Sequence, residues 1–230
     1  QREKMKIRAH YAGLVRGIDH EVGSIMEALN IKGLLKNTII ILSSDHGDYL
    51  GDHNLIGKSS FYDTCMRVPM LISGPTIPAG QVVNELVELR DVTSTILTFA
   101  GEKIPSHMDS RPLPGIGITS GPARERIYGM LMNGWMNYDG KWKLSRYATG
   151  ETTFFNLVSD PTEQVNLAND PSYFQTISRM DQEIAEEIMG SVKYAVHDRL
   201  VHGGDLSRDK GFGREGWQRP WPVPISFLDG

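Results

Sequence analysis

The sequence has little of several features that mark specialised classes of protein. Its 230 residues include one cysteine, Cys65, so no disulfide can form within the chain. Basic residues are not in excess, since 24 Lys and Arg stand against 28 Asp and Glu for a net charge of −4. Binding to phosphates needs a basic face, so we expect no nucleic acid as a partner.

Long apolar runs are also missing. The densest run, Ile39–Leu42, is far shorter than the ~20 residues that span a bilayer, and we expect no membrane partner. The first eight residues are charged and helix-like and do not begin with Met, so we expect the chain to start partway through a longer protein. What remains, 40% apolar and 23% charged residues, is typical of a globular protein.

The first half of the sequence has the pattern of an α/β core. Apolar residues recur at steps of three and four from Ile7 to Leu29, which predicts a helix with one apolar stripe. The β-branched run Thr38–Ser43 then predicts a parallel strand buried on both faces. Asp45, His46 and Gly47 follow at once, and open α/β sheets place ligands at the carboxyl ends of such strands.

The second half has the pattern of an antiparallel sheet. Residues 68–73 predict one more core strand, and residues 103–122, rich in Pro and Gly, predict a surface loop. Alternating segments follow, with Asp139-Gly140 as a hairpin turn. Asp170-Pro171-Ser172 predicts the start of a last helix.

Asp45 and His46 are the candidate metal ligands. They offer a carboxylate oxygen and an imidazole nitrogen side by side, but two ligands alone are too few for a stable site. Lys58 could add a positive charge that faces an anionic ligand. In the competing interpretation, the segment is an ordinary turn in which Asp45 accepts hydrogen bonds from backbone amides and His46 is merely exposed.

Several motifs resemble, in collinear order, the sulfatases of the alkaline phosphatase superfamily. The resemblance covers about residues 10 to 190. The first motif is the strand and site segment from Asn37 to Lys58, with Arg67-Val68-Pro69 after it. The second is Asp91-Val92-Thr93-Ser94-Thr95-Ile96-Leu97, which is similar to the family's "D-x-x-P-T-x-L" helix with Ser94 in place of Pro. The others are Gly140–Leu144 and Asp160–Leu167, and the latter matches the signature "D-P-x-E-x-x-N-L".

The resemblance implies roles for four residues. Asp45 and His46 fall on the pair that ligates a divalent cation, and Lys58 falls on the lysine that contacts the sulfate and its bridging oxygen. His53 falls on a histidine that recurs near the cleft. The family's nucleophile is a hydrated formylglycine, made from Cys or Ser in a C/S-x-P-x-R motif, and the metal polarises the sulfuryl group and lowers the nucleophile's pKa.

The chain departs from the family in what it contains. We expect the nucleophile motif and the two acidic metal ligands of the family's N-terminal region to be absent. The segment Cys65-Met66-Arg67-Val68-Pro69 is not the motif, because its order is C-x-R-x-P. We expect Cys65 to be a small buried residue. The chain then corresponds to the C-terminal portion of a sulfatase, inactive by itself, with the N-terminal portion of the same enzyme as its partner.

The resemblance, together with the periodicity and composition of the later segments, predicts the domain organisation. We expect residues 1–122 to form the C-terminal part of an alkaline-phosphatase-like α/β sandwich core with half of the metal site. Residues 123–200 would form a smaller antiparallel β-sheet subdomain with a C-terminal helix. Residues 201–230 would form an irregular tail, rich in Gly, Pro and Trp, that covers the body or a neighbouring subunit and so allows a homo-oligomer.

The function expected for the complete protein is metal-assisted hydrolysis of a small anionic sulfate monoester. Ca²⁺ is the expected metal, with Mn²⁺ or Mg²⁺ as alternatives. Some family members have Asn at the position of His46, and its oxygen suits Ca²⁺. The imidazole of His46 is less typical for Ca²⁺ and suits a borderline metal such as Mn²⁺ better. One rival function is hydrolysis of phosphonate or phosphate esters, and another is a catalytically silent binding or assembly module. The compartment stays open, since a typical sulfatase is periplasmic, secreted or lysosomal and a cytoplasmic location fits the sequence as well.

Overall fold

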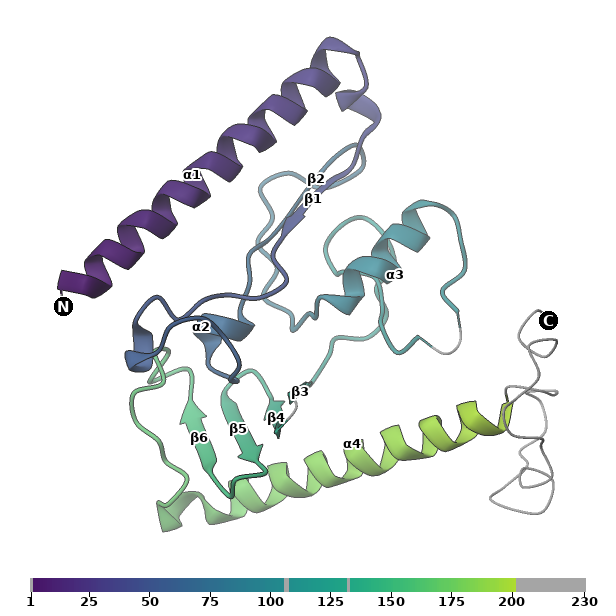
Figure 1. Ribbon diagram of the computed structural model, residues 1–230. Helices are drawn as coiled ribbons and strands as arrows, with labels where there is room; N and C mark the ends of the chain where they lie inside the picture. Colours follow the sequence, from purple (N-terminus) through teal and green to yellow (C-terminus); the bar gives the residue numbers. More distant parts are fainter. Residues whose placement is uncertain (1, 106–107, 132, 202–230) are drawn as a thin grey trace. The chain divides into compact units, whose positions relative to one another are not determined.

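The computed structural model describes residues 2–105, 108–131 and 133–201, with side chains as far as residue 192 (Figure 1). The predicted tail lies outside the described residues apart from its first one, Val201. The chain divides into two compact units, residues 1–174 and residues 175–230. Among the described helices, none is both long and apolar enough to cross a membrane.

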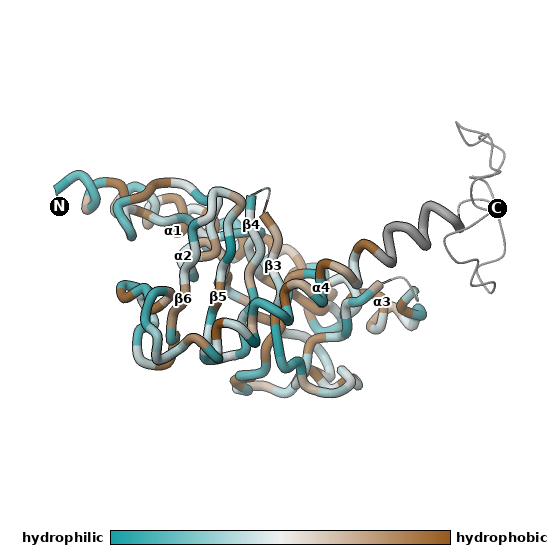
Figure 2. The backbone as a smooth tube through the Cα atoms, turned by 90° about the horizontal axis from the view of Figure 1, so that it is seen from below, coloured by the Kyte–Doolittle hydropathy of each residue, from teal (hydrophilic) through white to brown (hydrophobic). Residues whose placement is uncertain are grey.

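Helix α1 spans Arg2–Ile31 and confirms the helix predicted from the period of the apolar residues. Hydrophobic and hydrophilic residues interleave along it (Figure 2). None of its residues is buried, and Leu14, Ile18 and Ile25 are 60–67% exposed. The apolar stripe therefore forms as predicted, but the described chain leaves it largely exposed, with only Ile7, Val22 and Leu29 half-buried.

A two-stranded sheet follows the 3₁₀ turn Leu35–Asn37 and consists of β1, Ile40–Ser43, and β2, Met70–Ser73. The strands pair antiparallel, with Ile41 opposite Ile72, and no residue of either is fully buried. The prediction of a parallel strand buried on both faces is therefore wrong for the described chain. The periodicity identified a strand, but the direction of its neighbour depends on tertiary pairing that an apolar run does not encode.

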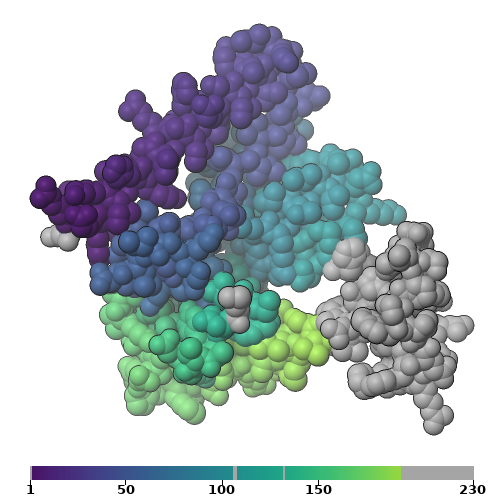
Figure 3. Space-filling view, in the orientation of Figure 1, coloured from purple at the N-terminus to yellow at the C-terminus, as the bar shows by residue number. Residues whose placement is uncertain are grey.

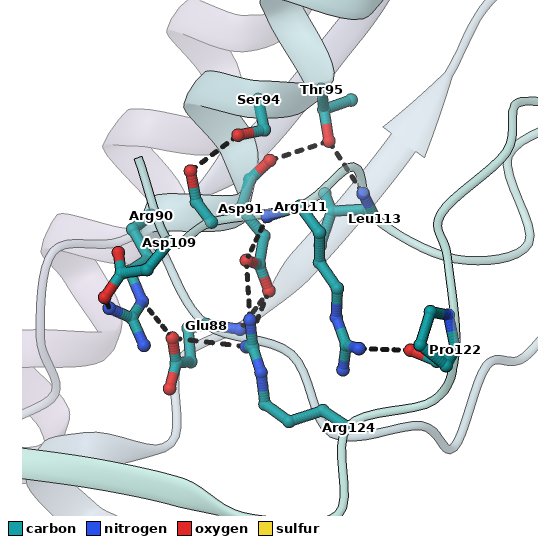
Figure 4. A network of polar contacts seen from close by, with 11 residues as sticks. Glu88, Arg90, Asp91, Ser94, Thr95, Asp109, Arg111, Leu113, Pro122 and Arg124 are labelled. Carbon is teal, nitrogen blue, oxygen red and sulfur yellow. Dashed lines mark hydrogen bonds and ion pairs between the residues drawn. The ribbon is translucent and has the colours of Figure 1, made fainter. Parts of the chain in front are cut away.

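Helix α3, Arg90–Phe99, is anchored by a buried ion pair (Figure 4). Both carboxylate oxygens of Asp91 lie 2.9 Å from the guanidinium of Arg124. Asp91 also accepts hydrogen bonds from the backbone N–H groups of Glu88 and Arg111. The described residues of the loop 103–122 are irregular, as predicted, but Leu113 and Ile116 among them are buried, so the segment is not simply a surface loop.

The predicted antiparallel sheet is present with four strands in sequence order. The strands are β3 (Ile127–Leu131), β4 (Gly134–Tyr138), β5 (Trp142–Tyr147) and β6 (Thr152–Asn156). The Asp139-Gly140 hairpin is confirmed, because Asp139 Oδ1 accepts from the N–H groups of Lys141 and Trp142.

Leu144 and Phe154 are completely buried in the four-stranded sheet, which has a true core. The Trp142 ring stacks on Phe154 at 5.0 Å between centroids, so this aromatic residue serves packing.

The last predicted helix is also present. Asp170 accepts a hydrogen bond from the N–H of Ser172 at 2.9 Å and begins a 3₁₀ turn, Pro171–Tyr173, that continues into α4, Phe174–Val201. Met180 and Ile184 of its predicted apolar stripe are buried.

Candidate active site

The residues that carry chemistry lie directly after the carboxyl end of β1. Asp45 Oδ1 accepts a hydrogen bond from the backbone N–H of His46 at 3.0 Å. Its other oxygen, Oδ2, lies 3.4 Å from His46 Nε2, so a carboxylate oxygen and a ring nitrogen face the same point. The Asp45 side chain is 83% exposed in the described chain, which leaves this pair open on one side.

The orientation of the His46 ring is fixed by its other nitrogen. His46 Nδ1 lies 2.7 Å from the carbonyl oxygen of Gly47. A carbonyl oxygen only accepts hydrogen bonds, so Nδ1 carries the proton and Nε2 keeps its lone pair. That tautomer is the one metal-binding histidines need, because the backbone holds one nitrogen and the other keeps a lone pair that can accept a hydrogen bond or bind a cation.

Lys58 completes the cluster. Its Nζ lies against His46 Nε2 in a short hydrogen bond, so the ammonium, the imidazole and the Asp45 carboxylate meet in one place. Desolvation alone would raise the pKa of Asp45, but His46, backbone N–H groups and Lys58 together hold it below the ordinary value. The carboxylate is therefore charged at neutral pH, as a metal ligand must be.

The cluster fits a divalent metal but supplies only part of a site. Asp45 and His46 offer one oxygen and one nitrogen ligand, a mixed set that suits Mn²⁺ as well as Ca²⁺. In residues 2–105, 108–131 and 133–201, no group of three or more His, Cys, Asp or Glu side chains could hold a metal ion. Further ligands would have to come from outside these residues.

His53 is brought to a different place. It lies in the 3₁₀ turn Asp52–Asn54, and its ring stacks on Tyr62 with centroids 3.8 Å apart. The described contacts of His53 do not include Asp45, His46 or Lys58. The role of His53 in contacting substrate stays a prediction.

The segment between His46 and Lys58 is held in a strained conformation. Leu50, His53 and Asn54 all have positive φ angles, between 49° and 63°. Such angles cost about 1–3 kcal/mol each outside glycine and gather at functional sites. Arg8 ties the segment to α1, because its guanidinium pairs with Asp52 at 2.5 Å and donates to the carbonyl of Leu50.

Two tyrosines, buried Tyr49 and half-buried Tyr62, lie beside the strained segment. Burial raises the pKa of Tyr49 to about 12, although a hydrogen bond with Ser60 opposes the shift. Burial also raises the pKa of Tyr62, and the negative charge of Glu163 adds to it. Both side chains are therefore neutral at pH 7 and add no charge beside the segment.

The expected absence of the nucleophile pattern needs one correction. Ser120-Gly121-Pro122-Ala123-Arg124 does match C/S-x-P-x-R. These residues have a structural role in the fold. Arg124 forms ion pairs with Asp91 and Glu88, and the carbonyl oxygen of Pro122 accepts a hydrogen bond from Arg111 (Figure 4). Cys65 is buried as predicted, and its carbonyl oxygen accepts from the N–H of Gly47.

Sequence comparison gives the relationship. Residues 1–102 match the family model for sulfatases. The chain is 30% identical over 220 residues to arylsulfatase K of Xenopus laevis, with 88% of this chain and 40% of that protein covered. It is 32% identical over 213 residues to an arylsulfatase of Clostridium perfringens, with 88% and 44% covered.

The predicted resemblance to the sulfatases of the alkaline phosphatase superfamily is confirmed. The chain spans less than half the length of these sulfatase relatives. A solved structure, the phosphonate monoester hydrolase of Agrobacterium radiobacter, matches 78% of this chain and 40% of its own at 25% identity, with a TM-score of 0.70. That match confirms the predicted alkaline-phosphatase-like α/β fold. Sulfatases in general have a divalent metal and a formylglycine.

Sequence reasoning missed part of the surroundings of the site. Asp63 was not predicted to matter, and Lys143 and Glu163 were noted only as members of the segments Gly140–Leu144 and Asp160–Leu167 that carry the resemblance. The structure joins the three in a buried ion-pair cluster. Glu163 and Lys143 lie 80 or more residues beyond Asp63, and a buried lysine has no periodic signal. Only the two motif segments that contain Lys143 and Glu163 could have pointed to the cluster.

Proposed function

We propose that the complete protein carrying this chain is a sulfuric ester hydrolase that cleaves a small anionic sulfate monoester at one divalent metal. The observation that carries the proposal is the meeting of Asp45, His46 Nε2 and Lys58 Nζ at the end of β1. A carboxylate, a neutral imidazole and an ammonium are the groups needed to hold a metal beside a tetrahedral anion. The arylsulfatase relatives support the assignment.

Each residue of the cluster has a distinct task in this proposal. Asp45 and His46 would hold the metal, and the Nδ1–H···O=C bond to Gly47 keeps the ring turned with Nε2 outward. When bound, the metal supplies Lewis-acid polarisation of the sulfuryl oxygens. Lys58 would place its ammonium beside the bridging oxygen and donate a hydrogen bond as that oxygen gains negative charge.

The rest of the site would come from the N-terminal portion of the same enzyme. The proposal needs a formylglycine nucleophile and further acidic ligands, and the relatives are more than twice as long as the region they share with this chain. We propose Ca²⁺ as the metal, with Mn²⁺ or Mg²⁺ as alternatives. The 230-residue chain alone should then neither hydrolyse sulfate esters nor bind metal tightly.

Turnover of 4-nitrophenyl sulfate by the complete protein tests the proposal. Asp45→Ala and Lys58→Ala should each lower kcat/KM by at least about a hundredfold, because each removes charge stabilisation from the transition state. Asp52→Ala is a matched control, since Asp52 lies on the same segment but pairs with Arg8. Unchanged turnover in both site variants would overturn the assignment.

Hydrolysis of phosphonate or phosphate esters is the alternative function. Two observations favour it: imidazole at position 46 suits Mn²⁺, and the solved phosphonate monoester hydrolase shares the fold. A higher kcat/KM on 4-nitrophenyl phenylphosphonate than on the sulfate would establish it. His46→Asn should then shift the metal preference from Mn²⁺ toward Ca²⁺. Turnover of neither ester would support a catalytically silent binding or assembly module.

A further inference from the structure

A buried ion-pair cluster lies one layer behind the candidate active site. Lys143 of β5 is 3% exposed, and its Nζ lies 2.6 Å from Asp63 Oδ1 and 2.6 Å from Glu163 Oε1. The side chain of Glu163 is 1% exposed. In Figure 3 the segment around residue 60 (blue) lies directly against the segments of residues 140–170 (green).

Such a cluster is costly to maintain. Removing charges from water carries a desolvation penalty that pairing offsets only with good geometry, and an apolar replacement is often as stable. Burial raises the pKa of Glu163, although Lys143 opposes the shift. Glu163 also has a φ of 56°, in the left-handed region. A residue that is buried, charged and strained at once points to a role beyond stability.

The signature segment Asp160–Leu167 is folded so that Glu163 faces inward. Asp160 Oδ2 accepts from the N–H of Val165 at 2.8 Å and closes the turn. Asn166 fixes the turn to β6, since its Oδ1 accepts from the N–H of Phe154 and its Nδ2 donates to the carbonyl of Thr152. The polar residues of the signature therefore set the position of the Glu163 carboxylate.

That carboxylate holds the short helix α2, Asp63–Met66, on which the site segment rests. Glu163 Oε2 accepts from the N–H of Asp63 at 2.7 Å. The N–H of Gly47 donates to the carbonyl of Cys65 at 2.8 Å. A Cβ at Gly47 would lie 2.0 Å from the carbonyl oxygen of Thr64, so the backbone beside His46 lies directly on α2.

We propose that Glu163 and Lys143 are positioning residues that, by fixing α2, hold Gly47 and so the Asp45–His46 pair in the geometry that binds metal. The path runs from the four-stranded sheet through the ion-pair cluster to α2 and then to Gly47. Its value as a device for metal binding rests on the proposed function, whereas the mechanical link to Gly47 does not.

Two variants and one control test the link in the complete protein. Glu163→Gln keeps the shape and an acceptor for Asp63 but removes the charge, and Lys143→Met removes the ammonium while keeping most of the stem. Asp91→Asn is the control, because it also breaks a buried ion pair but has no described contact with α2. Amide hydrogen exchange at Gly47 is measured without metal, and Ca²⁺ and Mn²⁺ affinities are measured by calorimetry.

Glu163→Gln and Lys143→Met should speed exchange at Gly47 at least tenfold and weaken the metal Kd by about tenfold. Asp91→Asn should change both by less than threefold. Equal changes in all three variants, or an unchanged Gly47 in the first two, would overturn the proposal. If the unaltered protein binds neither metal and cleaves no ester while exchange at Gly47 still responds, the proposed function fails and the link stands.

Discussion

Helix α1 and the four-stranded sheet are built from equally regular patterns but end in opposite environments. Leu144 of β5 is 0% exposed, whereas Leu14 of α1 is 67% exposed. The sheet strands pair with neighbours close in sequence, and each hairpin brings its own partner. Helix α1 has an apolar stripe that the described chain leaves largely exposed, and none of its residues is fully buried. The sheet is thus self-sufficient, and the region that carries the site is not.

This difference matters for function because the site belongs to the part of the chain that contains helix α1 and the two-stranded sheet. Asp45, His46 and Lys58 follow β1, a strand with one described neighbour, and Asp45 is open to solvent. The family relatives are more than twice as long as the region shared with this chain. In the proposed complete protein, we expect further residues to supply the remaining metal ligands and to cover helix α1.

The strongest contrast should come from one substitution made in both regions. Leu144→Ala should destabilise the 230-residue chain by about 3–5 kcal/mol, because it empties a buried space. Leu14→Ala should cost less than about 0.5 kcal/mol there, since the side chain is exposed. In the complete protein, Leu14→Ala should instead cost about 2–4 kcal/mol. Urea denaturation of both lengths measures each value, and a Leu14→Ala cost that is equal in the two would refute the comparison.

The buried ion pair beside α3 gives the next effect. Asp91→Asn should cost about 3 kcal/mol, because Arg124 stays buried with only Glu88 to balance it. Asp109→Asn, which removes a 73% exposed partner of Arg90, should cost less than about 1 kcal/mol. Guanidinium denaturation of the two variants separates them. Equal costs would mean that burial does not decide the worth of these pairs.

Two glycines test the comparison within the part of the chain that contains helix α1 and the site. Gly47→Ala should cost about 1–3 kcal/mol and displace the metal ligands, because its Cβ would collide with the carbonyl of Thr64. Gly13→Ala, with open space around it in α1, should stabilise the protein by about 0.5–1 kcal/mol through helix propensity. Thermal unfolding of both variants checks the opposite signs, and a harmless Gly47→Ala would argue against close seating on α2.

Alkaline pH should reveal the buried tyrosine behind the site. The pKa of Tyr49 is raised to about 12 in the folded chain, against 10.0 for an ordinary tyrosine. The folded form therefore favours the neutral phenol, and stability present below pH 10 is lost as the pH rises from 10 toward 12. The loss should be about 2 kcal/mol, and Tyr49→Phe should abolish that part of the slope. An identical slope in the variant would contradict the assignment to Tyr49.

The sequence predicted local structure well where the stabilising hydrogen bonds join residues that are close in sequence. The Asp139-Gly140 turn and the start of the last helix at Asp170 follow from side chains that bond backbone groups two or three residues away. The period predicted helix α1 but not its exposure, because burial depends on what packs against it. The antiparallel partner of β1 and the burial of Leu113 were missed for the same reason.

The candidate site shows the same division. Asp45, His46 and Lys58 lie within fourteen residues of one another, and their meeting could be predicted from a motif. The ion-pair cluster that holds α2 could not be predicted in this way, since Lys143 and Glu163 contact Asp63 from 80 and 100 residues further along the chain. Motifs identified groups that carry chemistry, whereas the positions of those groups depend on buried charges that have no sequence period.

Calorimetric titration of the complete, metal-free protein with Ca²⁺ and Mn²⁺ tests the central claim most directly. Asp45→Ala and His46→Ala should each weaken the Kd of the preferred metal at least about a hundredfold, while Asp52→Ala on the same segment should change it less than threefold. If the double variant Asp45→Ala/His46→Ala binds the metal as tightly as the unaltered protein, these two residues do not form the metal site and the account is contradicted.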